Sequence, residues 1–147
     1  MSERFLILGR IAVAAWIGVI FFSSTSLASR WCEALFGCVS RLLFQHVFPT
    51  PSSYDWIHLL ADKGLHVTLF CVLAVLLWQV NPRLSRKSIA IIACGAIIGS
   101  CSELLQRFFP GRDPAIRDVF INIGGTALGA AICAIAQKLR LSSGSHI

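Results

Sequence analysis

Four long apolar stretches, separated by short polar segments, dominate the pattern of hydrophobic and polar positions along this chain. Each stretch approaches the roughly 20 residues that a helix needs to cross the hydrocarbon core of a bilayer. Lipid offers backbone amides no partner, and none of the stretches alternates as the strands of a membrane barrel do, so each must be helical. The predicted spans are residues 5–27, 60–80, 88–107 and 116–137.

The segment between the first two spans is too polar to cross a membrane. Within it, apolar residues such as Trp31, Leu35 and Leu42 share one side of a helix that charged residues interrupt. Pro49 and Pro51 then end that helix. We therefore expect an interfacial amphipathic helix at about residues 30–48, which either covers the outer ends of the spans or lies free among the headgroups.

The amino-acid composition supports the same prediction of membrane-spanning helices. The chain has 147 residues, of which 56% are hydrophobic and 14% charged, with a mean hydropathy of +0.74. A soluble domain of this composition would lack polar surface, whereas a bilayer solvates apolar side chains. The prediction is an all-α integral membrane protein: one domain, residues 1–147, with four transmembrane helices and an interfacial amphipathic helix between the first and second.

The orientation in the membrane is predicted from the short loops. The loop at residues 81–87 carries three cations and no acid, which indicates a cytoplasmic loop and cytoplasmic N- and C-termini. The net charge of +6 then favours anionic lipid of the inner leaflet over a nucleic-acid partner, because no cluster of aromatic and basic residues stands outside the spans. A cleaved signal peptide is the alternative for the first span, but that stretch is longer than a usual signal core and lacks a clean cleavage site.

Ionisable residues stand at one end only of each of the last three spans. Residues 62–66 open the second span, residues 103–106 close the third, and residues 112–122 open the fourth. All three groups therefore lie on the same face of the membrane, which is the outer face in the orientation predicted above. A rise of about 1.5 Å per residue puts His66, Glu103 and Asn122 in one layer, about 7 to 9 Å inside. Since a charge near the bilayer centre costs at least about 2.5 kcal/mol, such residues normally face the bundle and pair with one another. The expected ligand-binding residues are Asp62, Lys63, His66, Glu103, Gln106, Arg112, Asp118 and Asn122.

Each of these spans carries its polar residues on one helical face, because successive side chains advance by about 100°. Small residues continue the same faces toward the membrane centre, and we expect their glycines to pack helix against helix. The faces are Asp62, His66 and Phe70, with Lys63 at the margin, on the second span; Gly95, Gly99, Ser102, Glu103 and Gln106 on the third; and Asp118, Asn122, Gly125 and Gly129 on the fourth.

These residues also have a purely structural interpretation. Asp62 and Asp118 are placed to cap helices, and Lys63 is placed to extend toward the headgroups. His66 is alternatively a core residue that donates to a carbonyl, and Glu103 lies among headgroups if its span ends early. The pairing of acids and cations is open at this stage, and two chemically sensible pairs are Glu103 with Arg112 and His66 with Asp118.

The six cysteines indicate neither a metal site nor a disulfide framework. Cys32 and Cys38 lie six residues apart on one predicted helix, which puts them on different sides. No zinc-ligand spacing, phosphate-binding loop, nucleotide fingerprint or Ser/His/Asp order occurs, so no metal and no cofactor is predicted. The other four cysteines lie within spans as small apolar residues: Cys71, Cys94, Cys101 and Cys133.

Ordered motifs on the four spans resemble those of a known family. They are Trp16-x-x-x-Ile20-Phe21-Phe22-Ser23-Ser24; Asp62-Lys63-x-x-His66; Glu103-x-x-Gln106 followed by Phe109-Pro110-Gly111-Arg112; and Asp118-x-x-x-Asn122-x-x-Gly125-x-x-x-Gly129. The chain resembles the VanZ-like family from Trp16 to about Gly129. That family is named for an accessory protein associated with low-level resistance to teicoplanin, a lipid-bearing glycopeptide antibiotic. One departure is Phe70, where the family often carries Tyr, so a role that needs this hydroxyl is not expected here.

Residues and resemblance together predict a bacterial inner-membrane protein whose outward-facing pocket binds a lipid or lipidated envelope molecule. The resemblance alone implies a link to glycopeptide tolerance. Arg112 would hold a phosphate or carboxylate and Glu103 would orient it, while His66 with Asp118 would form a titratable centre. The alternative is a membrane-embedded hydrolase or transferase for a lipid-linked substrate, with His66 and either Glu103 or Asp118 as base and acid. A metal held by His66, Glu103 and Asp118, and a purely structural role, are further alternatives.

Overall fold

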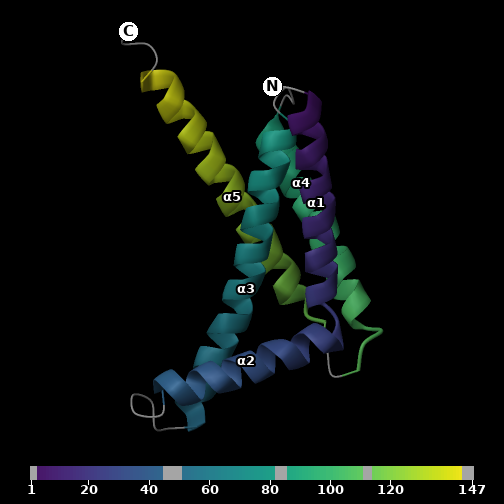
Figure 1. Cartoon of the computed structure of the whole chain (residues 1–147), viewed down its shortest axis with the longest axis vertical. Coiled ribbons are helices and arrows are strands. Elements are labelled where there is room, and N and C mark those ends of the chain that lie inside the picture. Colours follow the sequence, from purple (N-terminus) through teal and green to yellow (C-terminus); the bar gives the residue numbers. More distant parts are fainter. Residues whose placement is uncertain (1–2, 45–50, 82–85, 111–113, 144–147) are drawn as a thin grey trace.

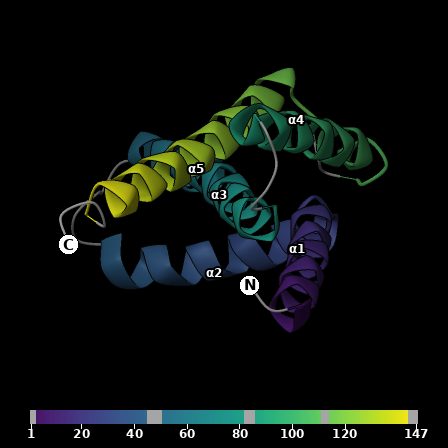
Figure 2. The ribbon, with the colours of Figure 1, turned by 90° about the horizontal axis from the view of Figure 1, so that it is seen from above.

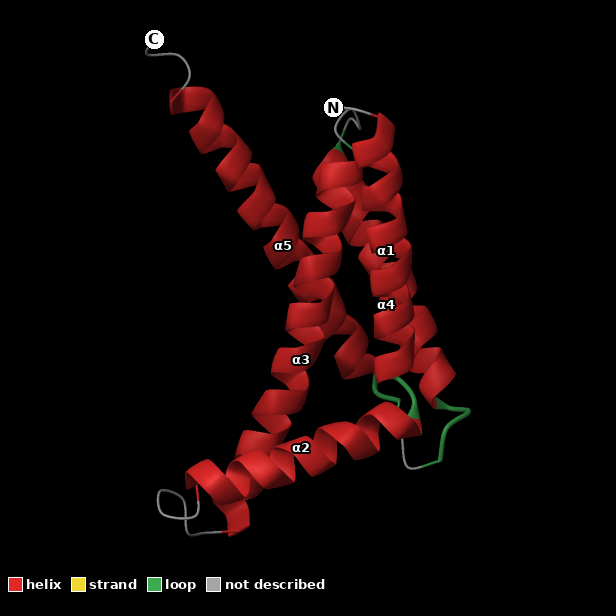
Figure 3. Ribbon diagram, in the orientation of Figure 1, coloured by secondary structure: helices red, strands yellow, loops and turns green. Residues whose placement is uncertain are grey.

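Five helices make up the described part of the computed structural model, which covers residues 3–44, 51–81, 86–110 and 114–143, and no strand occurs within it (Figure 3). In chain order the helices are α1 (Glu3–Ser23), α2 (Ser26–Phe44), α3 (Pro51–Val80), α4 (Lys87–Gln106) and α5 (Ile116–Ser143).

Four of these helices contain segments that are long and apolar enough to cross a membrane, which confirms the predicted four-span, all-α fold class. The segments are Glu3–Ser23, Leu59–Val80, Lys87–Gln106 and Ile116–Arg140. Three helix ends differ from the predicted spans by four residues or more, and one of them is that of α5, which continues to Ser143 instead of ending at 137. Helix α1 ends at Ser23, four residues early, and α3 begins at Pro51, well before the apolar stretch, as suits a proline in a first helical turn.

Local hydrogen bonds explain why α1 ends where it does. The hydroxyl groups of Ser23 and Ser24 both donate to the carbonyl oxygen of Ile20, at 2.7 and 3.2 Å, and that of Thr25 donates to Phe22, at 2.7 Å. The amide of Ser24, which would bond to the Ile20 carbonyl in a continuing α-helix, bonds instead to the carbonyl of Phe21 at 3.2 Å, and the two serine hydroxyls take its place at Ile20. The chain then turns into α2, where the Thr25 hydroxyl oxygen also accepts from the amide of Ala28 at 3.3 Å.

Helix α3 runs through the middle of the bundle and packs against α1, α4 and α5 (Figure 1). Its contact with α5 is the most extensive in the molecule, and the two helices diverge toward the C-terminal end of α5. Helix α2 lies across the end of the bundle opposite the N-terminal end of α1 (Figures 1 and 2). Since α4 ends and α5 begins at the α2 end, the polar ends of three helices are brought to the same side.

Glycines allow the closest approach of α5 to its neighbours. A Cβ added at Gly125 would lie 2.6 Å from the carbonyl oxygen of Val67 in α3, and one at Gly129 would lie 2.9 Å from Cβ of Ala74. Gly95 of α4 would meet the side chain of Thr126 in the same way. Backbone therefore packs directly against backbone where α5 crosses α3, as small residues permit in membrane bundles.

A small apolar core joins α1 to α3. Ile20, Phe70 and Leu73 are buried together, and Trp16 packs against them. The indole Nε1 of Trp16 donates to the carbonyl oxygen of Leu69 at 2.9 Å, which fixes α1 against the centre of α3. Many large apolar side chains on the outside of the bundle are exposed, as expected for helices that a bilayer surrounds.

The amphipathic helix predicted between the first two spans is present as α2, although it begins at Ser26 and residues 45–48 of the predicted segment lie outside the described residues. Leu27, Trp31 and Leu35 are 52 to 65% exposed and repeat every four residues along one side of α2. Its first residue is tied to the bundle, since the Ser26 hydroxyl donates to the carbonyl oxygen of Pro110 at 2.7 Å. The position of α2 at a membrane interface stays a prediction.

Candidate functional site

An ion pair between α3 and α5 forms the centre of the polar cluster. The ammonium nitrogen of Lys63 lies 2.7 Å from Oδ2 of Asp118 and 2.8 Å from Oδ2 of Asp62. Asp118 stands in the first turn of α5, where a carboxylate interacts favourably with the helix dipole. One ammonium therefore bridges two acids from two helices, and the side chain of Lys63 keeps 21% exposure at the edge of the bundle.

The Asp118 carboxylate is only partly satisfied by this pair. Asp118 is 6% exposed, and its second oxygen, Oδ1, is buried with no hydrogen-bond partner among the described residues. Nε of Arg117 lies 3.6 Å from Oδ1, which is within reach of an ion pair and too far for a good hydrogen bond. One acceptor in the interior of the site is thus available to a further positive group.

His66 is held by an amide from α5. Nδ1 of His66 lies 3.0 Å from Oδ1 of Asn122, a side chain that is 0% exposed. Because an amide oxygen only accepts, Nδ1 is the donor in this hydrogen bond, and in the neutral ring the lone pair is on Nε2. The amide nitrogen of Asn122 is buried with no hydrogen-bond partner in the described structure. Asn122 therefore fixes the tautomer and the orientation of the imidazole.

Glu103 and Gln106 form the α4 side of the site, and both are buried, at 5% and 4% exposure. Nε2 of Gln106 donates to Oε1 of Glu103 at 3.4 Å, and the backbone amide of Ala115 donates to Oε2 at 3.3 Å. Glu103 also lies within electrostatic range of Lys63, His66 and Asp118. Its direct contacts hold the residue just before α5, so Glu103 anchors the connection between α4 and α5.

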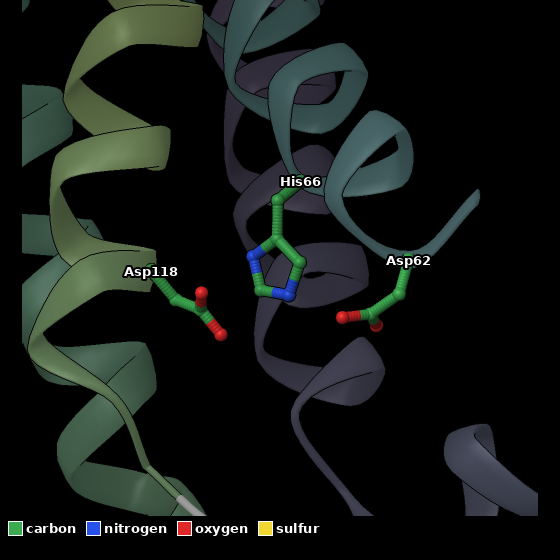
Figure 4. A group of neighbouring side chains, drawn as sticks. All are labelled: Asp62, His66 and Asp118. Atoms are coloured by element: carbon green, nitrogen blue, oxygen red, sulfur yellow. The ribbon is translucent and has the colours of Figure 1, made fainter. Parts of the chain in front are cut away.

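Asp62, His66 and Asp118 converge more tightly than the rest of the site. One potential ligand atom from each lies within 4.8 Å of the other two. Figure 4 shows the imidazole of His66 between the two carboxylates, with Asp62 and His66 on α3 and Asp118 on α5. The spacing of four residues brings Asp62 and His66 to one side of α3, as predicted.

The structure brings together most of the predicted site residues: Asp62, Lys63, His66, Asp118 and Asn122 interact across α3 and α5, and Glu103 with Gln106 lies beside them on α4. Arg112 lies outside the described residues, so the suggested pair of Glu103 with Arg112 does too.

The observed partners of His66 and Asp118 differ from the pair that charge alone suggested. The hydrogen bond of His66 goes to Asn122, and the ion pair of Asp118 goes to Lys63, although His66 and Asp118 are neighbours. The face of α4 was predicted correctly, since Gly95, Gly99, Ser102, Glu103 and Gln106 are all buried. On α5, the buried residues include the whole predicted stripe of Asp118, Asn122, Gly125 and Gly129.

Two contributors to the site were missed from sequence. The amide of Ala115 binds Glu103, but no pattern marks one backbone amide of a loop as a donor. Thr126 is fully buried against Gly95, and its hydroxyl donates to the carbonyl oxygen of Asn122 at 2.8 Å. Its position four residues after Asn122 was the available signal.

Fold and site together define a four-span membrane protein with a cluster of ionisable side chains inside one end of its bundle. The VanZ/LLP1 family model matches residues 10–137 of the chain, which therefore belongs to the VanZ/LLP1 family. The matched part contains every predicted site residue, and it confirms the family resemblance seen in the motifs. No curated protein and no solved structure matches the chain.

Proposed function

We propose that this protein resides in the bacterial inner membrane with both termini in the cytoplasm and its polar site facing outward. In this proposal the site binds the headgroup of a lipid or of a lipidated envelope molecule. One observation carries the proposal: an ionisable cluster lies at one end of the membrane-spanning segments, and its members range from buried to partly exposed. Asp118 has a side-chain exposure of 9%, whereas Lys63 has 21% and Asp62 has 35%.

The partly exposed members of the cluster, Lys63 and Asp62, are accessible to a ligand from outside the bundle. Ionisable residues inside a membrane are costly and commonly mark sites of ligand or ion passage. The four spans carry many exposed apolar side chains, which the tails of a lipid would contact. A ligand with a polar head and apolar tails would contact the ionisable cluster with its head and the apolar side chains of the spans with its tails.

The residues divide into two roles in this proposal. Lys63, His66 and Asp62 are partly exposed and would contact the headgroup. Glu103 accepts from the amide of Ala115, three residues after Arg112, and would position the connection that carries this cation. Arg112 would then hold a phosphate or carboxylate group through its planar fork of donors. In this proposal Glu103 positions Arg112 through the backbone at Ala115, whereas the sequence suggested that Glu103 orients Arg112 directly.

The position of α2 fits the same proposal. Its exposed face of Leu27, Trp31 and Leu35 would lie at the headgroups, across the end of the bundle where the site lies. A link to teicoplanin tolerance follows from the resemblance to the VanZ-like family, and it would operate through the lipid tail of such a glycopeptide.

Lipid retention tests this function. Wild-type protein, the site variant His66→Ala and the control Thr68→Ala are purified in mild detergent with a metal chelator, and their retained lipids are measured by mass spectrometry. Thr68 is exposed on the same helix, and its hydroxyl bonds back to Gly64 at 2.8 Å, so its loss should leave the site intact. We expect one lipid class to be retained by wild type and by Thr68→Ala and lost from His66→Ala. Equal retention by all three, or no lipid class enriched in the wild type, would contradict the proposal.

A membrane-embedded hydrolase or transferase is the second candidate, favoured by the arrangement of His66. Its Nδ1 is held by Asn122 while the ring lies between two carboxylates, as in an oriented general base. Incubation of the protein with lipid-linked phosphate substrates should then release a product that His66→Gln does not release. Equal product from wild type and from His66→Gln would exclude this role for His66.

A further inference from the structure

We infer that Asp62, His66 and Asp118 form a binding site for one divalent transition-metal ion, of which Mn²⁺ and Zn²⁺ suit the ligands best. This inference does not rest on the lipid ligand proposed above. The three potential ligand atoms lie within 4.8 Å of one another and come from two separate helices. One imidazole nitrogen and two carboxylates form a donor set that these ions accept, and positions for water or substrate would stay open.

The orientation of His66 supports coordination through Nε2. Asn122 accepts the hydrogen bond of Nδ1 at 3.0 Å, which leaves the lone pair on Nε2. Metal-binding histidines are commonly oriented by an acceptor on the other ring nitrogen, and a buried amide oxygen serves that purpose. Figure 4 shows the ring directed into the space between Asp62 and Asp118.

A second and independent observation is the unsatisfied oxygen of Asp118. This residue is 6% exposed, and its Oδ1 is buried without a hydrogen-bond partner in the described structure. Nε of Arg117 approaches Oδ1 only to 3.6 Å, so a metal ion bound through this oxygen would give the buried acceptor the close partner that it lacks. The site therefore has unused capacity for positive charge at its most buried member.

Lys63 is the competitor for this site. Its ammonium lies between the two carboxylates, 2.8 Å from Asp62 and 2.7 Å from Asp118, so it occupies the position that a metal ion would take. Its long flexible stem and partial exposure allow the ammonium to move outward toward the headgroups. The two carboxylates would then balance the charge of one divalent ion, with the neutral imidazole as the third ligand.

Titration of full-length protein with Mn²⁺ tests the inference. The protein is purified in detergent and stripped with EDTA, and free Mn²⁺ is followed by its electron paramagnetic resonance spectrum. We expect one saturable Mn²⁺ per chain that Zn²⁺ displaces. Asp62→Asn and His66→Gln should each weaken binding by at least about tenfold. The control Glu33→Gln, an exposed acid on α2, should bind as wild type does.

The variant Lys63→Met distinguishes a metal site from two carboxylates whose only cation is the lysine. Removal of the competing ammonium should tighten Mn²⁺ binding by about tenfold or more, because the carboxylates lose their internal cation. The inference is overturned if wild type shows no saturable binding below about 1 mM. It is also overturned if Asp62→Asn and His66→Gln both bind as wild type does, or if Lys63→Met binds more weakly. Lipid retention is measured with metal chelated, so a failure of that experiment leaves this one independent.

Discussion

The ammonium nitrogen of Lys63 on α3 lies 2.7 Å from the Oδ2 atom of Asp118 on α5, although 55 residues separate the two in sequence. This contact joins the most extensively packed pair of helices at the end where the chain carries its polar residues. With 9% side-chain exposure, Asp118 has little access to water that could replace the lysine. The pair is therefore both a link between helices and the centre of the candidate site.

Loss of the lysine should destabilise the protein through the acid that it leaves behind. We expect Lys63→Met to lower the free energy of unfolding by about 1–3 kcal/mol in metal-free detergent solution, since a largely buried carboxylate loses a charged donor. The double variant Lys63→Met with Asp118→Asn should be less destabilised than the sum of the single variants. Unfolding followed by circular dichroism measures all four proteins. Strict additivity would show that the two side chains do not interact.

Close packing of α5 on α3 predicts opposite effects for two neighbouring glycines. Gly125→Ala should destabilise the bundle by about 1–3 kcal/mol, because its Cβ meets the backbone of Val67. Gly124→Ala should be neutral or stabilising by up to about 1 kcal/mol, because nothing lies within 4 Å of its Cβ and alanine favours a helix. The same unfolding measurement compares the two variants. Equal effects would contradict the described contact between the helices.

The bond from the amide of Ala115 to Glu103 predicts a local effect on the connection between α4 and α5. In Glu103→Ala this amide loses its acceptor at 3.3 Å, and its hydrogen exchange should accelerate by about five- to tenfold. Glu103→Gln keeps a side-chain oxygen and should retain most of the protection. Hydrogen exchange measured by mass spectrometry on peptides that contain Ala115 tests this. Unchanged exchange in Glu103→Ala would show that the bond contributes nothing.

The proposed orientation predicts which residues a membrane-impermeant maleimide reaches in intact cells. Pro114, Arg86 and Lys138 are all exposed, with Pro114 near the start of α5 and the other two toward the opposite end of the bundle. In a cysteine-free background, we expect Pro114→Cys to be labelled from the periplasm, and Arg86→Cys and Lys138→Cys only after permeabilisation. The reverse pattern would place the polar site on the cytoplasmic face and would contradict an outward-facing pocket.

Hydrophobic pattern was sufficient for the fold class because the bilayer imposes the secondary structure. In lipid, an apolar stretch of about 20 residues satisfies its backbone hydrogen bonds only as a helix. The number of helices therefore follows from the number of apolar stretches. Periodicity was equally informative about faces. The buried polar residues of α4, Ser102, Glu103 and Gln106, all belong to the predicted face. Where a helix ends depends on local hydrogen bonds, and the hydroxyl groups near Ser23 shortened α1 relative to its apolar stretch.

Residue type and position on a face determined that these polar groups would meet, but not which atoms would pair. By charge alone, either Glu103 or Asp118 could pair with His66 or with Lys63, and the actual contacts depend on how the helices cross. The close approach of α5 to α3 at Gly125 brings Asn122 to His66 and Asp118 to Lys63. Rotation of either helix by one residue would turn these side chains away from their partners, because neighbouring side chains on a helix point about 100° apart.

The amino-acid sequence by itself determined that this is a four-span membrane protein of the VanZ/LLP1 family whose polar faces lie at one end of the bundle, since those properties follow from residue order and helical period. Only the tertiary structure decided that Asp62, rather than Glu103, joins His66 and Asp118, and that Glu103 holds the backbone of Ala115. These outcomes depend on distances between atoms of different helices. Such distances are determined by how closely the helices pack, which no single segment of the chain specifies.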